Sequence, residues 1–174
     1  MNEITINNTV IELFIGDLTQ TKYEAIVIPS NSRLLPSGEL RCKVIREAGS
    51  KVQIECNVIA QKISSLPVGS AVITSGGNLC SRYIIHARAG HDGKRIVTAI
   101  WNSLKTADKN NVKSLVFPPL MKDVIGFSAK KSSQLMLPVI KKYLIEKNSQ
   151  IKNVSICLET LPDYKAFENV LQTL

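Results

Sequence analysis

The chain lacks any apolar run long enough to cross a membrane. Its longest runs, Ala25 to Pro29 and Leu135 to Ile140, fall far short of the ~18 residues that a spanning helix requires. The start of the chain, Met1 to Thr5, also lacks the basic and then apolar pattern of a secretory signal. We therefore expect a soluble, cytoplasmic protein that is not exported and has no membrane partner.

Clustered metal ligands are scarce as well. The chain has two histidines and four cysteines, and no two cysteines form a Cys-x-x-Cys pair; the cysteines are Cys42, Cys56, Cys80 and Cys157. A structural zinc site needs about four such ligands at close spacing. We expect no metal and no cofactor, and cysteines that are reduced and packed in a cytosolic core.

The composition excludes collagen, low-complexity disorder and a two-domain enzyme. The 174 residues are 44% hydrophobic and 21% charged, and no linker or internal repeat interrupts them. A chain of this length is close to the ~150 residues of an ordinary domain. We predict one domain that spans residues 1–174.

The basic residues outnumber the acidic residues but are spread along the chain. There are 22 Lys and Arg against 14 Asp and Glu, a net charge of +8, which raises encounter rates with phosphate-bearing partners and identifies none of them. Pairs such as Lys130-Lys131 and Lys141-Lys142 fall in the middle of predicted helices. This pattern favours solvated helix faces over a stripe for nucleic acid.

Strand-like and helix-like segments alternate along the chain. Runs rich in Val, Ile and Thr predict strands at Glu3 to Asn7, Thr9 to Ile15, Ala25 to Pro29, Ser70 to Ser75, Arg82 to Ala87, Ser114 to Pro119 and Val154 to Glu159. Most of the later runs are solidly apolar, as in strands that are covered on both faces. We predict an α/β fold: a three-layer α/β/α sandwich with a mixed, mostly parallel sheet of about seven strands.

Five helices are expected between and after these strands. Apolar stripes with helical spacing run from Ile96 to Ala107 and from Ala129 to Leu144. A helix is also predicted from Glu39 to Ala48, where Gly49 ends it, and Pro162 opens the last helix. Ser50 and Gln53 have the spacing of a capping box, which predicts a helix from there to about Ile63.

Two loops at the carboxyl ends of predicted strands are unusually long. They run from Ser30 to Gly38 and from Met121 to Phe127, whereas connections of this kind usually take ~2 to 6 residues. In the second loop, Gly126 lets a backbone approach a ligand closely, and Ser128 is the expected N-cap of the helix that follows. Because ligands of open α/β sheets settle at this edge, the two loops indicate a binding cleft.

Five segments together resemble the macro domain family, whose members bind ADP-ribose and its relatives. The family motifs are Gly-Asp-Ile-Thr, Ala-Ile-Val-Asn-Ala-Ala-Asn, Gly-x-Ala-x-x-Thr-x-Gly, Ile-Ile-His and a Phe-Pro segment that ends in Gly-Phe. Their counterparts, in the same order and spacing over nearly the whole chain, are Gly16 to Thr19, Ala25 to Asn31, Gly69 to Gly76, Ile84 to His86 and Phe117 to Phe127. The resemblance implies the macro fold and a nucleotide cleft.

The resemblance also assigns roles to single residues. Asp17 matches the aspartate that accepts a hydrogen bond from the adenine amino group, with the Leu18 amide beside it, and Asn31 matches an asparagine near the distal ribose. The residues that match the two loops around the diphosphate are Gly38, Val124, Ile125, Gly126 and Phe127. His86 matches a structural position. Each polar residue has a plainer reading, since Asp17 could cap a turn and Asn31 could bond its own backbone.

Several positions depart from the family pattern. Arg41 stands where hydrolytic members carry a catalytic aspartate, and a guanidinium cannot act as a general base near neutral pH. In the second loop, Lys122 and Asp123 replace small residues, so Asp123 places an anion where an anion should bind. The aromatic residue that often covers adenine falls near Cys157, which cannot stack comparably.

These departures leave three hypotheses. In the first, the cleft binds ADP-ribose, a related nucleotide or an ADP-ribosylated protein without turnover, and the side chains of Arg41 and Lys122 converge on the phosphates. In the second, the fold has lost its ligand and serves as an interaction or RNA-binding module. In the third, it hydrolyses ADP-ribosyl groups or ADP-ribose-1''-phosphate, and Glu39 is the one nearby carboxylate that could replace the missing base.

Overall fold

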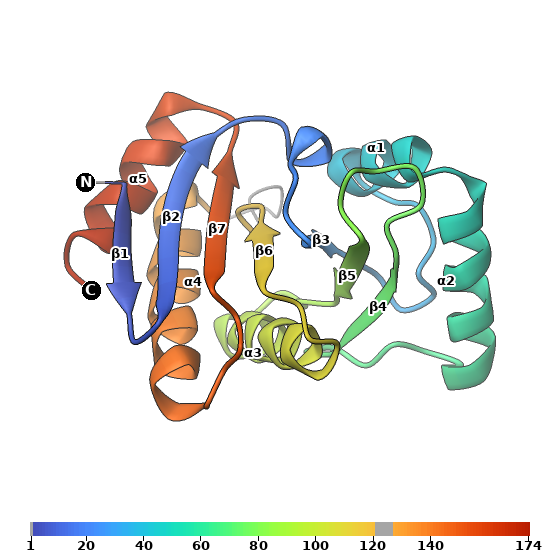
Figure 1. Cartoon of the computed structure of the whole chain (residues 1–174). Coiled ribbons are helices and arrows are strands. Elements are labelled where there is room, and N and C mark those ends of the chain that lie inside the picture. Colours follow the sequence, from blue (N-terminus) through green and yellow to red (C-terminus); the bar gives the residue numbers. More distant parts are fainter. Residues whose placement is uncertain (1, 121–126) are drawn as a thin grey trace.

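A seven-stranded mixed sheet forms the centre of the molecule. The computed structural model describes residues 2–120 and 127–174. The strands are β1 (Glu3–Ile6), β2 (Thr9–Ile15), β3 (Ala25–Pro29), β4 (Ala71–Ser75), β5 (Tyr83–Ala87), β6 (Ser114–Phe117) and β7 (Asn153–Leu158). They lie in the order β1-β2-β7-β6-β3-β5-β4, which Figure 1 shows from β1 beside the chain termini to β4 at the opposite edge.

The five inner strands are parallel, and each edge strand is antiparallel to its neighbour. β2 pairs in parallel with β7, β7 with β6, β6 with β3, and β3 with β5, whereas β1 and β4 each pair with an antiparallel partner. This arrangement confirms the predicted mixed, mostly parallel sheet. Because β2, β7, β6, β3 and β5 point the same way, their carboxyl ends meet at one edge of the sheet.

Helices cover both faces of the sheet. The helices are α1 (Glu39–Ala48), α2 (Ser50–Ile63), α3 (Gly93–Lys109), α4 (Ala129–Glu146) and α5 (Leu161–Leu171), and a short 3-10 turn, η1 (Leu18–Gln20), follows β2. One buried cluster joins α3, α4 and α5 to the sheet, and a second joins α1 and α2 to its other face. The three-layer sandwich is therefore as predicted. In the described residues, no helix is long and apolar enough to cross a membrane.

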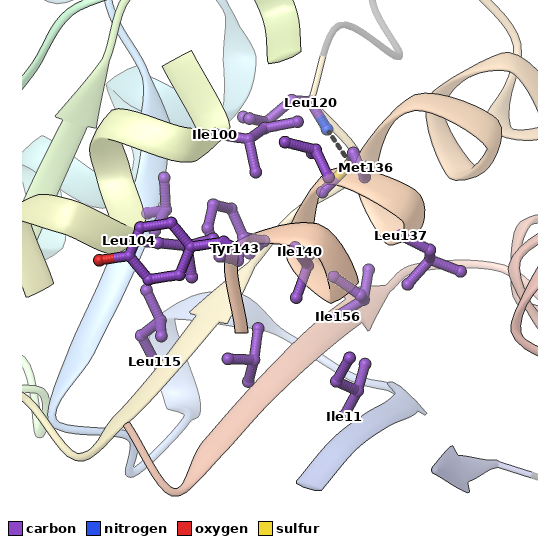
Figure 2. Close-up of a cluster of buried hydrophobic side chains, with 14 of the residues drawn as sticks. Ile11, Ile100, Leu104, Leu115, Leu120, Met136, Leu137, Ile140, Tyr143 and Ile156 are labelled. Atoms are coloured by element: carbon purple, nitrogen blue, oxygen red, sulfur yellow. Dashed lines mark hydrogen bonds between the residues drawn. The ribbon is translucent and has the colours of Figure 1, made fainter. Parts of the chain in front are cut away.

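The larger cluster anchors the end of the strand that leads toward the second long loop. Figure 2 shows Ile100 of α3, Met136 and Ile140 of α4 and Ile156 of β7 gathered between the helices and the sheet. Leu120, which is 1% exposed, adds its side chain to this cluster, and its backbone N–H donates to the Met136 sulfur at 3.4 Å. The chain is thus held firmly up to Leu120.

The predicted capping box at the start of α2 does not form. The N-cap is Gly49, which has a φ of +90° and also ends α1, so the two helices join at a single residue. Only glycine adopts this backbone conformation without strain, and it takes the cap position from Ser50. The Gln53 amide instead donates to Asn57 Oδ1 at 2.9 Å and to the Leu34 carbonyl.

The cysteines are only partly as expected. All four are free thiols, and Cys56 and Cys157 are buried as predicted. Cys42 and Cys80 are exposed, which corrects the expectation that all four pack in the core. Cys42 lies in α1, where helical periodicity places it on the outer face, opposite the buried residues 44, 45 and 48. Cys80 lies in the turn between β4 and β5, outside any helix or strand.

Candidate functional site

A cleft of about 280 Å³ opens at the carboxyl ends of β2, β6 and β7, beside the start of α1. Its walls come from four segments that are far apart in the sequence. The residues that line it are Gly16, Asp17, Leu18, Glu39, Leu40, Lys43, Pro118, Pro119, Cys157 and Glu159. The position agrees with the edge at which open α/β sheets bind ligands.

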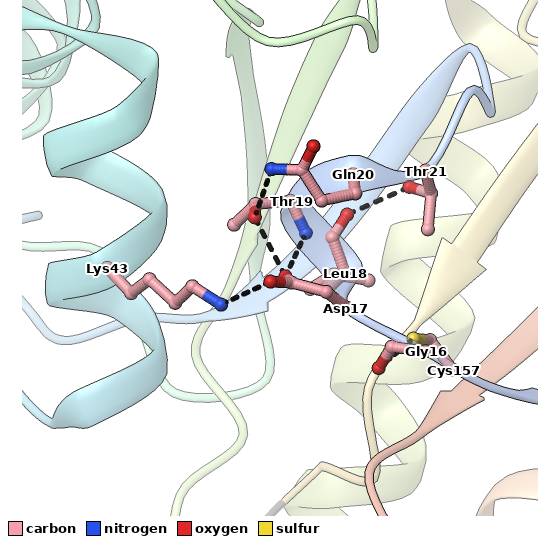
Figure 3. A network of polar contacts seen from close by, with 8 residues as sticks. All are labelled: Gly16, Asp17, Leu18, Thr19, Gln20, Thr21, Lys43 and Cys157. Atoms are coloured by element: carbon pink, nitrogen blue, oxygen red, sulfur yellow. Dashed lines mark hydrogen bonds and ion pairs between the residues drawn. The ribbon is translucent and has the colours of Figure 1, made fainter.

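Asp17 lies where β2 ends, and its carboxylate has two kinds of partner. Oδ1 accepts hydrogen bonds from the Thr19 backbone N–H at 2.9 Å and from the Thr19 hydroxyl at 2.7 Å, so Asp17 is the N-cap of η1. Oδ2 accepts a bond from Lys43 Nζ at 2.5 Å, as Figure 3 shows. The side chain of Asp17 is nevertheless 40% exposed, and it faces the cleft.

The ammonium of Lys43 keeps Asp17 ionised. Its hydrogen bond, together with those from Thr19, lowers the pKa of the Asp17 carboxyl, and the same contact raises the pKa of Lys43. Lys43 reaches Asp17 from the cleft-facing side of α1, one helical turn beyond Glu39. Sequence reasoning did not single out Lys43, although its i, i+4 spacing from Glu39 places both residues on one helix face.

The described part of the cleft is acidic overall. Among the described residues, the carboxylates of Asp17 and Glu39 line it beside the ammonium of Lys43. A negative potential opposes phosphate and favours groups that donate hydrogen bonds. This end of the cleft is therefore suited to the neutral, donor-bearing part of a ligand.

The floor of the cleft is closed by a protonated thiol. Cys157 Sγ donates to the Gly16 carbonyl at 3.3 Å, and the residue is 3% exposed. Burial, with the nearby charges of Asp17 and Glu159, raises the pKa of Cys157 to about 12. Because a thiol with such a pKa carries almost no thiolate, Cys157 is a packing group rather than a nucleophile.

Arg41 does not face the cleft, and the prediction that its charge converges on phosphates is wrong. The residue is 1% exposed and points between α1, α2 and the sheet. It shares this inward helix face with residues 44, 45 and 48, whereas residues 39, 40 and 43 line the cleft. Helical periodicity thus divides α1 into a core face and a cleft face.

Neutral groups surround the buried guanidinium of Arg41. Nε donates to the Leu35 carbonyl, Nη2 donates to the Leu34 carbonyl, and Nη1 lies next to His86 Nδ1, each at 2.9 Å. The Cys56 sulfur lies 3.9 Å from Nη2. Burial lowers the pKa of Arg41 below its usual value. The cation ties the loop that follows β3 to the core.

His86 is a buried structural residue, as predicted. It is completely buried, and its Nε2 lies 2.8 Å from the Thr74 hydroxyl oxygen. Since a guanidinium can only donate, Nδ1 accepts from Arg41, and a neutral ring then carries its proton on Nε2. Burial and the charge of Arg41 lower the pKa of His86 to about 3, so the ring is neutral at physiological pH.

Asn31 bonds within its own loop. Its Nδ2 donates to the Leu35 carbonyl at 2.6 Å and to the Ser37 hydroxyl at 2.8 Å, and its Oδ1 accepts from the backbone N–H groups of Arg33 and Leu35. These contacts match the alternative interpretation of Asn31, a loop asparagine that bonds nearby backbone groups. The residue does not line the cleft around Asp17.

The remaining predicted site residues fall into two groups. Gly38 is the N-cap of α1 with a φ of +73°, and Phe127 is half-buried with Lys131 Nζ 4.3 Å from its ring centroid. Ser128 caps α4 as predicted, by accepting from the Lys131 N–H. The other predicted site residues of the second loop, Lys122, Val124, Ile125 and Gly126, lie outside the described residues, and so does Asp123. The structure therefore brings Asp17 and Leu18 together in the cleft, but not Asn31, Gly38 or Arg41.

No metal site accompanies the cleft in the part of the chain that the structure describes. No group of three or more His, Cys, Asp or Glu side chains in residues 2–120 and 127–174 is placed to hold a metal ion. The chemistry available in the described cleft consists of carboxylate acceptors, ammonium donors and backbone groups.

Solved structures with this fold are macrodomains. The Oceanobacillus iheyensis macrodomain with ADP superimposes with a TM-score of 0.90 at 24% identity, over 98% of this chain and 94% of that one. The Trypanosoma brucei macrodomain in complex with ADP superimposes with a TM-score of 0.83 at 24% identity, over 92% of this chain and 68% of that one. These likenesses confirm the predicted fold.

Sequence relatives lead to the same family. A macro domain-containing protein of Caldanaerobacter subterraneus is 32% identical over 171 residues, which cover 94% of this chain and 97% of that protein. O-acetyl-ADP-ribose deacetylase 1 of Pantoea vagans is 31% identical over 163 residues, which cover 90% and 95%. The Macro domain model matches residues 27–136. With a fold, a cleft position and a family model that agree, this chain belongs to the macro domain family.

Proposed function

We propose that the cleft binds ADP-ribose or a related nucleotide without turnover. The observation that carries this proposal is the position of Asp17, whose exposed carboxylate faces the cleft at the end of β2. One lone pair of Oδ2 is left for an incoming donor, since Thr19 occupies Oδ1 and Lys43 occupies one site on Oδ2. The adenine amino group is such a donor.

The charge of the described cleft supports this orientation of the ligand. Asp17 and Glu39 disfavour phosphate at the Asp17 end and favour the amino-bearing base there. The diphosphate then extends away from the Asp17 end of the cleft. The macrodomain structures with ADP, and the relative named for O-acetyl-ADP-ribose, point to the same ligand class.

Calorimetric titration with ADP-ribose tests the proposal. Asp17→Asn retains an oxygen for the Thr19 cap and replaces Oδ2 with an NH₂ group, which repels the adenine amino group. We expect at least a tenfold loss of affinity, because hydrogen bonds to charged groups contribute roughly 1.5 to 3 kcal/mol. Glu146→Gln, on the exposed side of α4, removes the same charge away from the cleft and should leave the affinity unchanged. The absence of heat up to millimolar ADP-ribose with the wild-type protein would reject the proposal.

The same variants separate binding of a small nucleotide from binding of RNA. If the basic surface binds single-stranded RNA, a gel shift should weaken steeply with salt and should not change in Asp17→Asn. That result, with no heat from ADP-ribose, would favour the interaction module.

Hydrolysis is the third candidate, and it is tested because Glu39 lines the cleft and one relative is named a deacetylase. Arg41 supports binding without turnover, since its side chain is buried and cannot activate water. We expect no release of ADP-ribose from a mono-ADP-ribosylated protein, and no deacetylation of O-acetyl-ADP-ribose, with the protein at stoichiometric concentration. Release that disappears in Glu39→Gln would assign turnover to Glu39.

A further inference from the structure

The ion pair between Asp17 and Lys43 gives the base end of the cleft two opposite hydrogen-bonding groups in one place. The carboxylate oxygen and the ammonium nitrogen are 2.5 Å apart, and both side chains line the cleft. The side chains are 40% and 37% exposed, so a ligand can reach either of them. Figure 3 shows Lys43 extending from its helix to the carboxylate.

Asp17 can accept only one further hydrogen bond toward a ligand. Two bonds from Thr19 fill Oδ1, and the bond from Lys43 takes one of the two acceptor sites on Oδ2. A base therefore cannot make two parallel bonds to this carboxylate. The base instead finds one free acceptor site on Asp17 Oδ2, with the ammonium of Lys43 beside it.

Lys43 supplies donors at the same point. An ammonium has three N–H donors, and in the described residues Asp17 accepts the one hydrogen bond that the structure gives to Nζ. A carbonyl oxygen that approaches Asp17 alone would be repelled by the carboxylate. With Lys43 beside it, the same oxygen accepts a charge-assisted bond.

We propose that Lys43 is a specificity-determining residue that makes the cleft tolerant of the purine 6-substituent. This inference rests on the proposed function. A 6-amino group, as in adenine, donates to Asp17 Oδ2. A 6-oxo group at the same position, as in hypoxanthine, accepts from Lys43 Nζ. Asp17 without Lys43 would accept the amino group and reject the oxo group.

The test compares two ligands that differ at the 6-position of the base. ADP and IDP carry the same ribose and diphosphate, so contacts to those parts cancel in the ratio of their dissociation constants. The two bases also differ at N1, which carries a proton in hypoxanthine, so the change in the ratio between variants is compared rather than the ratio alone. The measured quantity is Kd(IDP)/Kd(ADP) from calorimetric titration of the wild-type protein and of Lys43→Met.

We expect the ratio to rise about tenfold in Lys43→Met, because the variant frees Asp17 for the amino group and leaves the oxo group opposite a bare carboxylate. Lys43→Arg keeps charged N–H donors and should retain the ratio of the wild-type protein. Lys62→Met removes the same charge from an exposed position of α2 outside the cleft and should also leave the ratio unchanged.

The outcomes separate this inference from the proposed function. A rise of threefold or more in Lys43→Met alone supports the inference, and a smaller rise or a fall overturns it. Wild-type protein that binds ADP but gives no heat with IDP at millimolar concentration overturns it as well and leaves the proposed function intact. Wild-type protein that binds neither nucleotide nor ADP-ribose overturns both.

Discussion

Arg41 illustrates how a single residue carries a structural role that its charge does not suggest. The guanidinium is buried, yet its hydrogen bonds go to the carbonyl groups of Leu34 and Leu35 and to a neutral His86. Backbone carbonyls and an imidazole nitrogen replace the water that the charge loses. Arg41 thereby holds the loop between β3 and α1 against the core.

Replacement of Arg41 by methionine should lower the free energy of unfolding by about 3 kcal/mol. Methionine fills similar volume but leaves His86 Nδ1 buried without a donor, at a cost of about 1 to 3 kcal/mol. It also removes one of two donors from each of the Leu34 and Leu35 carbonyl groups, which keep their bonds from Gln53 and Asn31. Urea denaturation measures the change. Arg46→Met, on the exposed side of the same helix, should stay within about 0.5 kcal/mol of the wild type. Equal stability of the two variants would contradict a structural role for Arg41.

At the scale of elements, glycines set how closely neighbouring segments approach. A Cβ on Gly76, in the turn between β4 and β5, would lie 1.8 Å from the Ser81 carbonyl oxygen. Gly38, at the start of α1, has a φ of +73°, but none of the described residues has an atom within 4 Å of the corresponding position. The first glycine is required by space, and the second only by its backbone conformation.

This difference predicts unequal costs of substitution with alanine. Gly76→Ala should lower the free energy of unfolding by about 3 kcal/mol, because backbone must move to relieve the overlap. Gly38→Ala should cost about 1 to 2 kcal/mol, the strain of a side chain at φ +73° and ψ 162°. Thermal and urea unfolding of both variants check the order. A larger loss in Gly38→Ala would show that the loop before α1 has contacts at this position.

At the scale of the whole molecule, acid stability depends on a histidine that stays neutral. His86 has a pKa of about 3 when folded, below the ~6.5 of an unfolded chain. Between these values the unfolded state binds one more proton than the folded state, so stability falls as the pH falls. Arg41 and Cys56 are the ionisable groups next to the ring. The pKa of Cys56 is raised by burial, so this thiol does not titrate in this window, and a guanidinium stays protonated throughout it.

From pH 7 to pH 5 this single group should lower the free energy of unfolding by about 2 kcal/mol. Urea denaturation at the two pH values measures the loss in the wild-type protein and in His86→Gln. The variant should lose less by about that amount, since no imidazole titrates at position 86. An equal loss in both proteins would mean that His86 is protonated in the folded state.

The local pattern of the chain determined most elements. The predicted bounds of α1, α2, β2 and β3 agree with the structure, because apolar spacing and terminal glycines or prolines act within a few residues. β6 ends at Phe117, two residues before the prediction, since Pro118 and Pro119 have no N–H for a strand ladder. The motif Gly16 to Thr19 likewise indicated the cleft residue Asp17 before any contact was known.

The directions and partners of the polar side chains were decided by tertiary structure. Arg41 faces the core, Asn31 bonds its own loop, and Lys43 reaches Asp17 across 26 positions of sequence. A sequence pattern reports which residues share a helix face or a strand face. Which neighbour that face contacts depends on the order of the strands in the sheet. The free energy of a buried charge such as Arg41 depends on the polar groups that the tertiary structure places around it.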